Sequence, residues 1–320
     1  MKLNSQKYFF LIIMILSVMI MFSSNNWIYS WMMLEINFFF MIPFLSTNKI
    51  MTDQLMKFFI IQSISSSLLL FTVTFCSITE NLIYQNILLM TSLSTKMGLM
   101  PFHFWLPSLI NYSSWENCFL MFTLQKIPSS ILFNQMLEIN LLTFIMSVSL
   151  IIAPILSMKQ SSTKKMMAYI SISSLSWMLL SLNQSSWLFL FFMLIYSIIS
   201  FNLIKSLKMN NLIFINQMNM NNLYKLNLIF SSLSMAGVPP FTGFLPKMMI
   251  LQSLTKNNLF MLTMMILSSV LLTFTFFNFL SSKMLTTSLM KKKNYKFSKT
   301  KLFPTLFNLI FLSMLFFLKY

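Results

Sequence analysis

A ten-residue pattern, G-x-x-P-F-x-x-x-L-P, occurs twice in this chain. The first copy is GLMPFHFWLP, from Gly98 to Pro107, and the second is GVPPFTGFLP, from Gly237 to Pro246. Both copies lie in apolar segments of helix length and together contain all three glycines of the chain. An interrupted helix backbone is tolerated at membrane depth only where protein buries it or where it lines a wet cavity. Two interrupted helices at matching positions of two halves therefore indicate a transport pathway, and we expect it to carry protons.

Apolar residues make up 57% of the 320-residue chain and charged residues only 8%. Because soluble domains carry roughly 25% charged residues, this composition predicts a membrane protein. About 11 apolar segments approach the ~20 residues that a helix needs to cross a bilayer. They fall approximately at 7–23, 27–46, 57–79, 82–100, 116–134, 139–157, 163–183, 186–205, 226–250, 258–281 and 302–319. The sequence thus predicts an all-α polytopic membrane protein of about 11 transmembrane helices, with inverted repeats and two broken helices.

We expect a single antiporter-like transmembrane domain over residues 1–320. Its parts are a first half-channel at about 27–134 with a break near 98–107, a second half at about 139–281 with a break near 237–246, and a C-terminal helix at about 302–319.

All 22 basic residues are lysines, and most of them lie on one side of the predicted membrane. Successive connections between the spans lie on alternate sides of the membrane. This assignment places 17 lysines on the side of the N-terminus and only Lys256 and Lys319 on the other side. The positive-inside rule then puts the N-terminus on the matrix or cytoplasmic face. The net charge of +17 is a topology signal, not a nucleic-acid signal. The run from Lys291 to Lys301 could bind anionic lipid, although a solvated loop explains it more simply.

Four ionisable residues lie inside predicted spans: Glu35, Lys96, Lys126 and Lys247. Each costs about 2.5–3.5 kcal/mol at the bilayer centre on insertion scales, so such groups usually face the protein interior and pair. A shared polar pathway accounts for all four, and snorkelling from a helix end is the alternative for Lys96 and Lys247. A buried lysine near a carboxylate can exchange protons near neutral pH. We therefore predict a Glu35–Lys96 pair, a central relay at Lys126, and an entry or exit site at Lys247.

Other polar residues permit more than one interpretation. His103 follows the first break and could relay protons or bond a loop carbonyl, and as the single histidine it excludes His-based metal or haem clusters. Cys76 and Cys118 are interpreted as small buried hydrophobes. The serine clusters at 63–67 and 171–176 are typical of helix packing in membranes, with a water-lined path as the alternative.

Four stretches of the chain carry a set of motifs in a fixed order. They are LEIN at 34–37, TKMGLMPFHFWLP at 95–107, LQKI at 124–127 and GVPPFTGFLPK at 237–247. They resemble the L-E-I-N, T-K-x-G-x-A-P-F-H-F-W-x-P, W-Q-K-I and G-x-P-P-F-x-G-F-x-P-K segments of mitochondrial NADH dehydrogenase subunit 2. That family is one of the antiporter-like subunits in the membrane arm of respiratory complex I, and the resemblance spans essentially the whole chain.

The resemblance implies that Glu35, Lys96, Lys126 and Lys247 are proton-channel residues of an H⁺-translocating NADH:ubiquinone reductase in the mitochondrial inner membrane. It also implies that this chain binds no redox cofactor, because other subunits use NADH, FMN, iron–sulfur clusters and ubiquinone; no metal-binding residues are predicted. The implied partners are other complex I subunits, especially neighbouring antiporter-like ones, and the lipid bilayer, but not nucleic acid.

Three positions depart from the family pattern. Ser174 stands where the span-seven motif has a histidine, Ser108 where an acid follows the first motif's last proline, and Leu124 where a tryptophan precedes Q-K. The change at 174 removes a proton relay there unless the serine holds a water. An Mrp-type cation/proton antiporter subunit and a passive structural subunit are the alternative functions. The complex I motifs argue against the first alternative, and the paired breaks with their own lysines argue against the second.

Overall fold

The computed structural model describes residues 5–46, 51–76, 82–134, 139–217, 222–254 and 259–284. Within these ranges the chain forms 13 α-helices and no strand, so the all-α prediction is confirmed for the described residues. Six of these helices are long and apolar enough to cross a membrane, and Leu142–Met158 is a shorter apolar helix. The expected helix at 302–319 and the run Lys291–Lys301 lie outside the described residues. The number of about 11 spans stays a prediction.

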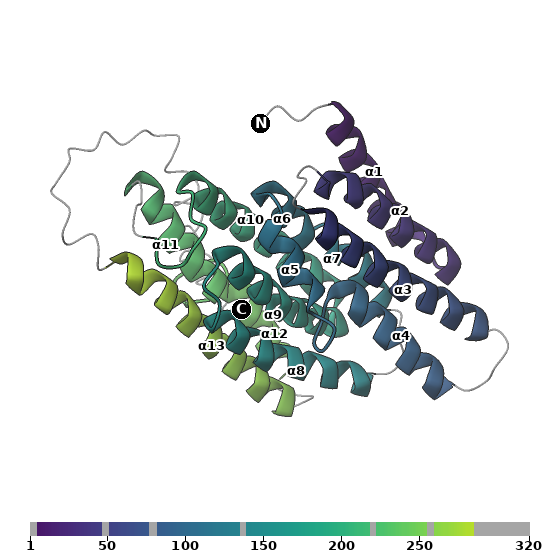
Figure 1. Ribbon diagram of the computed structural model, residues 1–320. Coiled ribbons are helices and arrows are strands. Elements are labelled where there is room, and N and C mark those ends of the chain that lie inside the picture. The colour runs from purple at the N-terminus through teal and green to yellow at the C-terminus, as the bar shows by residue number, and fades with distance from the viewer. Residues whose placement is uncertain are drawn as a thin grey trace. The chain divides into compact units, whose positions relative to one another are not determined.

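The chain divides into two compact units, 1–149 and 150–320. The helices of the first unit, shown in Figure 1, are α1 (Ser5–Ser23), α2 (Trp27–Leu45), α3 (Thr52–Cys76), α4 (Leu82–Met97), α5 (Trp105–Tyr112), α6 (Trp115–Phe122) and α7 (Lys126–Asn134). In this unit α3 packs against α2, α4 and α5, and α1 packs against α2 and α7. Aromatic rings join three of these helices: Phe58 lies 5.3 Å from Phe38 and 5.3 Å from Trp105, measured between ring centroids.

The second unit follows α8 (Ile139–Met158), which crosses the boundary between the units. Its helices are α9 (Thr163–Gln184), α10 (Ser186–Met209), α11 (Asn222–Ala236), α12 (Phe244–Leu254) and α13 (Leu259–Met284). Helix α9 is buried along most of its length and contacts α10, α12 and α13. It is therefore the central helix of the unit, and its many serines donate to carbonyls one turn earlier, as Ser171 and Ser173 do.

Both glycine-containing breaks are present. Helix α4 ends before Gly98 (φ +71°), and α11 ends before Gly237 (φ +83°). In both cases the left-handed glycine allows the next N–H groups to bond carbonyls of the last turn, which ends the helix. The Leu99 amide donates to Ser94 over 3.0 Å and the Val238 amide to Leu233 over 3.3 Å.

A third interruption, which the sequence analysis did not predict, separates α6 from α7 at 123–125. Its cause is Pro128, which has no N–H to bond the carbonyl four residues earlier and whose ring clashes with that carbonyl. The carbonyl concerned belongs to Leu124, in the middle of the interruption. Pro128 itself lies in the first turn of α7, where a missing N–H costs little. Pro128, two residues after Lys126, was therefore the sequence signal for this break.

Candidate functional site

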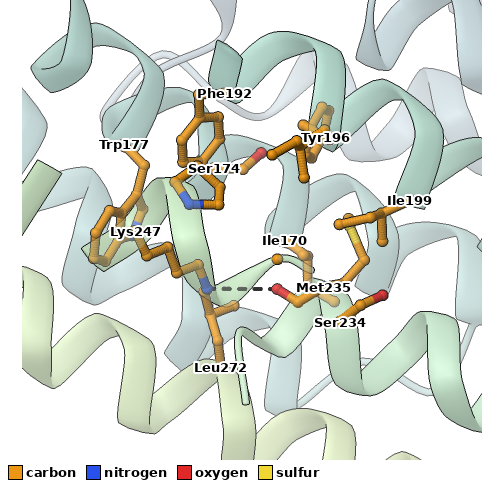
Figure 2. A pocket seen from close by; sticks show the side chains of 13 residues that line it. Ile170, Ser174, Trp177, Phe192, Tyr196, Ile199, Ser234, Met235, Lys247 and Leu272 are labelled. Atoms are coloured by element: carbon orange, nitrogen blue, oxygen red, sulfur yellow. Dashed lines mark hydrogen bonds between the residues drawn. The ribbon is translucent and has the colours of Figure 1, made fainter. Parts of the chain in front are cut away.

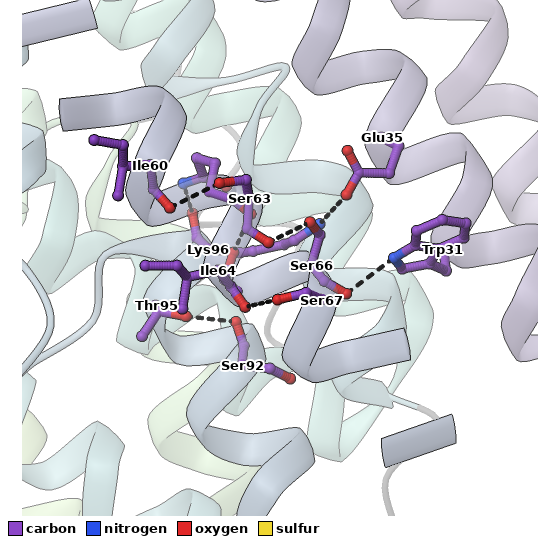
Figure 3. A network of polar contacts seen from close by, with 12 residues as sticks. Trp31, Glu35, Ile60, Ser63, Ile64, Ser66, Ser67, Ser92, Thr95 and Lys96 are labelled. Carbon is purple, nitrogen blue, oxygen red and sulfur yellow. Dashed lines mark hydrogen bonds and ion pairs between the residues drawn. The ribbon is translucent and has the colours of Figure 1, made fainter. Parts of the chain in front are cut away.

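Glu35 and Lys96 lie side by side in the first unit, as shown in Figure 3. Lys96 Nζ is 3.9 Å from Glu35 Oε1, and the side chains are 5% and 15% exposed, respectively. Lys96 belongs to the last turn of α4, where a positive charge interacts favourably with the helix dipole. Gln62 on α3 donates its side-chain amide to the Lys96 carbonyl over 3.1 Å. Because this carbonyl lies at a helix end, the glutamine supplies a partner that the helix cannot.

A chain of amide side chains links the same region to the α6–α7 break. Gln125 Nε2 donates to Asn37 Oδ1 over 2.7 Å. Asn37 Nδ2 in turn lies 3.3 Å from Ser17 Oγ and 3.4 Å from the Met14 carbonyl oxygen, both on α1. A cavity of about 20 Å³, large enough for a water molecule, is lined by Asn37, Gln125 and Lys96 among others. The sequence analysis did not select Asn37 or Gln125, although each is an amide in an otherwise apolar segment and stands beside a selected charge.

Lys126 is the first residue of α7 and is 2% exposed. Its Nζ lies 5.8 Å from the centroid of the Phe122 ring on α6, across the break. A positive charge at a helix N-terminus opposes the helix dipole, so the helix itself does not favour this lysine in its charged form.

Lys247 lies in the second unit, in the first turn of α12, and is 8% exposed. Its Nζ donates to the Ala236 carbonyl over 2.8 Å and lies 3.5 Å from the Met235 carbonyl. These carbonyls end α11, so the ammonium group of one half-helix binds the negative end of the other. Figure 2 shows the contact of Lys247 with the Met235 carbonyl and the Trp177 ring beside the lysine; Nζ is 5.5 Å from the ring centroid.

Gly237 makes this arrangement possible. A Cβ atom at Gly237 would lie 2.8 Å from Lys247 Nζ and 2.9 Å from its Cδ, so any side chain there would displace the lysine. Gly243 serves a different purpose, because its Cβ would lie 1.8 Å from the Ser234 carbonyl oxygen of α11. The glycines of the second copy therefore bring α12 and its lysine against the end of α11.

The remaining predicted site residue, His103, is buried between α4 and α5. Its Nδ1 lies 3.1 Å from the Pro101 carbonyl oxygen, which is the loop contact that the sequence analysis named as the alternative to a relay. Cys118 is buried, with its Sγ 3.0 Å from Ser113 Oγ. Among the described residues, no group of three or more His, Cys, Asp or Glu side chains could hold a metal ion. Of the four predicted charged residues, Glu35, Lys96 and Lys126 belong to the first unit and Lys247 to the second.

The chain matches a known protein family over most of its length. The protein-family model described as "NADH:quinone oxidoreductase/Mrp antiporter, TM" matches residues 24–275 of this chain. NADH-ubiquinone oxidoreductase chain 2 of Anopheles gambiae is 35% identical over 268 residues, which cover 79% of this chain and 79% of the mosquito protein. The protein of the same name from Gallus gallus is 32% identical, covering 77% of this chain and 76% of its own length. This chain belongs to the NADH-ubiquinone oxidoreductase chain 2 family.

Solved structures share the fold. A chain of respiratory complex I from Thermus thermophilus with bound aureothin aligns with a TM-score of 0.83 at 17% identity, covering 96% of this chain and 78% of that one. A chain of the Mrp complex from Dietzia aligns with a TM-score of 0.72 at 14% identity, covering 86% and 59%. As a chain 2 family member with several apolar helices, this chain is a multi-pass membrane protein.

Proposed function

We propose that this chain is a proton-translocating membrane-arm subunit of mitochondrial NADH:ubiquinone oxidoreductase. The main observation in support is that each of three interrupted helical segments has a buried lysine at its interruption: Lys96, Lys126 and Lys247. Charged groups in membrane segments are costly and mark ion pathways, and broken helices bring backbone dipoles and room for water to the same place. Family membership supports the assignment, because the relatives that share it carry the name NADH-ubiquinone oxidoreductase chain 2.

Each residue takes a part that follows from its contacts. Glu35 holds Lys96 in its charged form while the two lie 3.9 Å apart, and separation of the pair allows the lysine to release its proton. Lys126 changes charge at a helix end that does not favour the cation. Lys247 exchanges protons at the second break, where the α11 carbonyls bind its ammonium form. His103 is proposed as an auxiliary relay next to the first break.

The same proposal includes the topology and the partners. About 11 spans cross the inner membrane, with the N-terminus on the matrix side, as the lysine distribution indicates. Within these spans, short helices on either side of a break, such as α6 with 8 residues and α7 with 9, share one crossing of the membrane. The chain itself performs no redox chemistry; NADH oxidation and ubiquinone reduction occur in other subunits, and neighbouring antiporter-like subunits pass on the energy.

The test is proton pumping measured against NADH oxidation in membranes that carry Lys126→Met. Methionine keeps the length and apolar stem of lysine but cannot carry a proton, so we expect pumping or coupled turnover to fall in an assembled complex. Lys205→Met is the matched control, because Lys205 is an exposed lysine of α10. Normal rates in both variants would contradict the proposal. Separation of the chain from NADH dehydrogenase activity on fractionation would instead favour the free Mrp-type antiporter.

A further inference from the structure

Helix α3 connects the two helices that carry the acid and the lysine of the first unit. Glu35 lies on α2 and Lys96 on α4, and both helices pack against α3. Within the described residues, direct contact between α2 and α4 is minor at most, and α7 touches both less extensively than α3 does. The distance between the two charged side chains therefore depends mainly on how α2 and α4 are each placed on α3.

The first connection runs from α3 to the end of α4. Gln62 is 6% exposed, and its side-chain amide donates to the Lys96 carbonyl over 3.1 Å. The carbonyls of the last turn of a helix need partners from outside it. The Thr95 carbonyl, for example, accepts from the Trp105 indole over 3.1 Å. Loss of the Gln62 amide would leave a buried acceptor unsatisfied in the same turn that carries the lysine side chain, so this turn would reorient.

The second connection runs from α2 to α3. Trp31 Nε1 donates to the Ser66 carbonyl over 3.0 Å, as shown in Figure 3. Trp31 lies one turn before Glu35 on α2, so both side chains project from the same side of that helix. Ser66 likewise lies one turn after Gln62 on α3. One strip of α3 thus bonds the helix of the acid and, one turn away, the helix of the lysine.

The separation of the charged pair makes these connections important. Lys96 Nζ and Glu35 Oε1 are 3.9 Å apart, beyond the 2.7–3.2 Å of an N–H···O hydrogen bond. Within the described residues, Glu35 Oε1 has no hydrogen-bond partner. No direct bond therefore fixes the distance between the two groups. Because their attraction falls with separation, a small shift of either helix on α3 changes how strongly the carboxylate holds the charged lysine.

We propose that Gln62 and Trp31 are positioning residues, which act through α3 to set the separation of Glu35 and Lys96 and so control proton release from the lysine. Gln62 holds the last turn of α4, and Trp31 anchors α2 one turn before the acid. The control of proton release rests on the proposed function, whereas the anchoring of the two helices does not.

The first experiment measures coupled NADH oxidation per assembled complex in Gln62→Met. Methionine keeps the length of glutamine but has no N–H to donate. We expect about a tenfold lower coupled rate, the population change that one lost buried hydrogen bond produces. We also expect a changed pH profile, because the distance to a carboxylate affects the pH range over which a lysine releases its proton. A loss of packing alone would reduce the amount of assembled complex without changing the pH profile.

Thr72→Val is the matched control for this variant. Thr72 is a buried residue of α3 whose hydroxyl donates to the Leu69 carbonyl of the same helix over 2.7 Å. Valine has the same shape and removes one buried hydrogen bond without touching the connection to α4. We expect a normal rate per assembled complex and a normal pH profile.

The second experiment uses Trp31→Phe, which keeps an aromatic ring but removes the indole N–H. We expect the same two changes as in Gln62→Met, and this variant also tests the proposal if Gln62→Met does not assemble. Trp27→Phe is its control, because Trp27 lies one turn earlier on α2 and its indole makes no hydrogen bond within the described residues. Density maps of the assembled variants should show a Glu35–Lys96 distance that differs from that of the unmodified complex.

The outcomes separate this proposal from the proposed function. Normal pumping in Lys96→Met would refute the proposed function at this lysine, whatever the other variants do. Reduced pumping in Lys96→Met, together with normal rates and pH profiles in Gln62→Met and Trp31→Phe, would refute only the positioning role. An unchanged Glu35–Lys96 distance in both variants would overturn the anchoring itself.

Discussion

Replacement of Gly237 by alanine tests whether the second break exists to position a lysine. The substitution has two costs that can be separated. The first is backbone strain, because Gly237 has φ +83° and a left-handed residue with a side chain costs about 1–2 kcal/mol. The second is displacement of Lys247, whose Nζ would lie 2.8 Å from the new Cβ and which would lose its bond to Ala236. A hydrogen bond to a charged group contributes about 1.5–3 kcal/mol.

Gly98→Ala is the matched control for this variant. Gly98 has φ +71°, so alanine there meets the same backbone strain, but its Cβ would lie 3.3 Å from the Trp105 ring and touch no lysine. The difference between the two variants is therefore the lysine contribution of about 1.5–3 kcal/mol. This energy corresponds to a roughly 10- to 150-fold smaller population with Lys247 in place. Gly237→Asn is a second control, since asparagine tolerates the left-handed conformation but still brings a Cβ to the lysine.

The assay is the ratio of protons pumped to NADH oxidised, normalised to the amount of assembled complex on native gels. We expect similar assembly losses in Gly98→Ala and Gly237→Ala, and a much larger loss of pumping in Gly237→Ala. Gly237→Asn should assemble better than Gly237→Ala and pump equally poorly. Equal pumping per assembled complex in all three variants would refute the reasoning, because the position of Lys247 would then not matter.

Three further predictions follow from contacts of the described residues. Gly243→Ala should prevent accumulation of the subunit on native gels, because its Cβ would lie 1.8 Å from a carbonyl oxygen of α11; normal accumulation would show that the helix ends separate easily. Asn37→Leu and Gln125→Leu should each slow coupled turnover, because each removes the 2.7 Å hydrogen bond between the two side chains. The double variant should be no slower than the slower single variant. Additive effects of the two substitutions would argue against a shared role. Glu35→Gln should reduce assembly, because it leaves the buried Lys96 without its counter-charge, and added Lys96→Met should restore assembly but not pumping. Restored pumping in that double variant would exclude Lys96 from the proton path.

Features set by local chemistry could be predicted from the sequence. The apolar composition indicated a membrane protein, and the glycines before Pro101 and Pro240 marked two breaks, because glycine adopts the left-handed conformation that ends a helix. The lysines at 96, 126 and 247 stood out because charged residues are rare in apolar segments. Even the break at 123–125 had a local cause in Pro128, although that signal was not used.

Only the tertiary structure decided which of these groups meet. Gln125 bonds Asn37 from 88 positions along the chain, and Lys96 reaches Glu35 on another helix. The two copies of the repeated pattern also place their lysines differently: Lys96 precedes its glycine, whereas Lys247 follows its last proline and returns to the α11 carbonyls. Backbone interruptions follow from the conformational limits of single residues, whereas these partners depend on how whole helices pack. The sequence therefore indicates the interruptions directly, but it gives no distances between side chains on different helices.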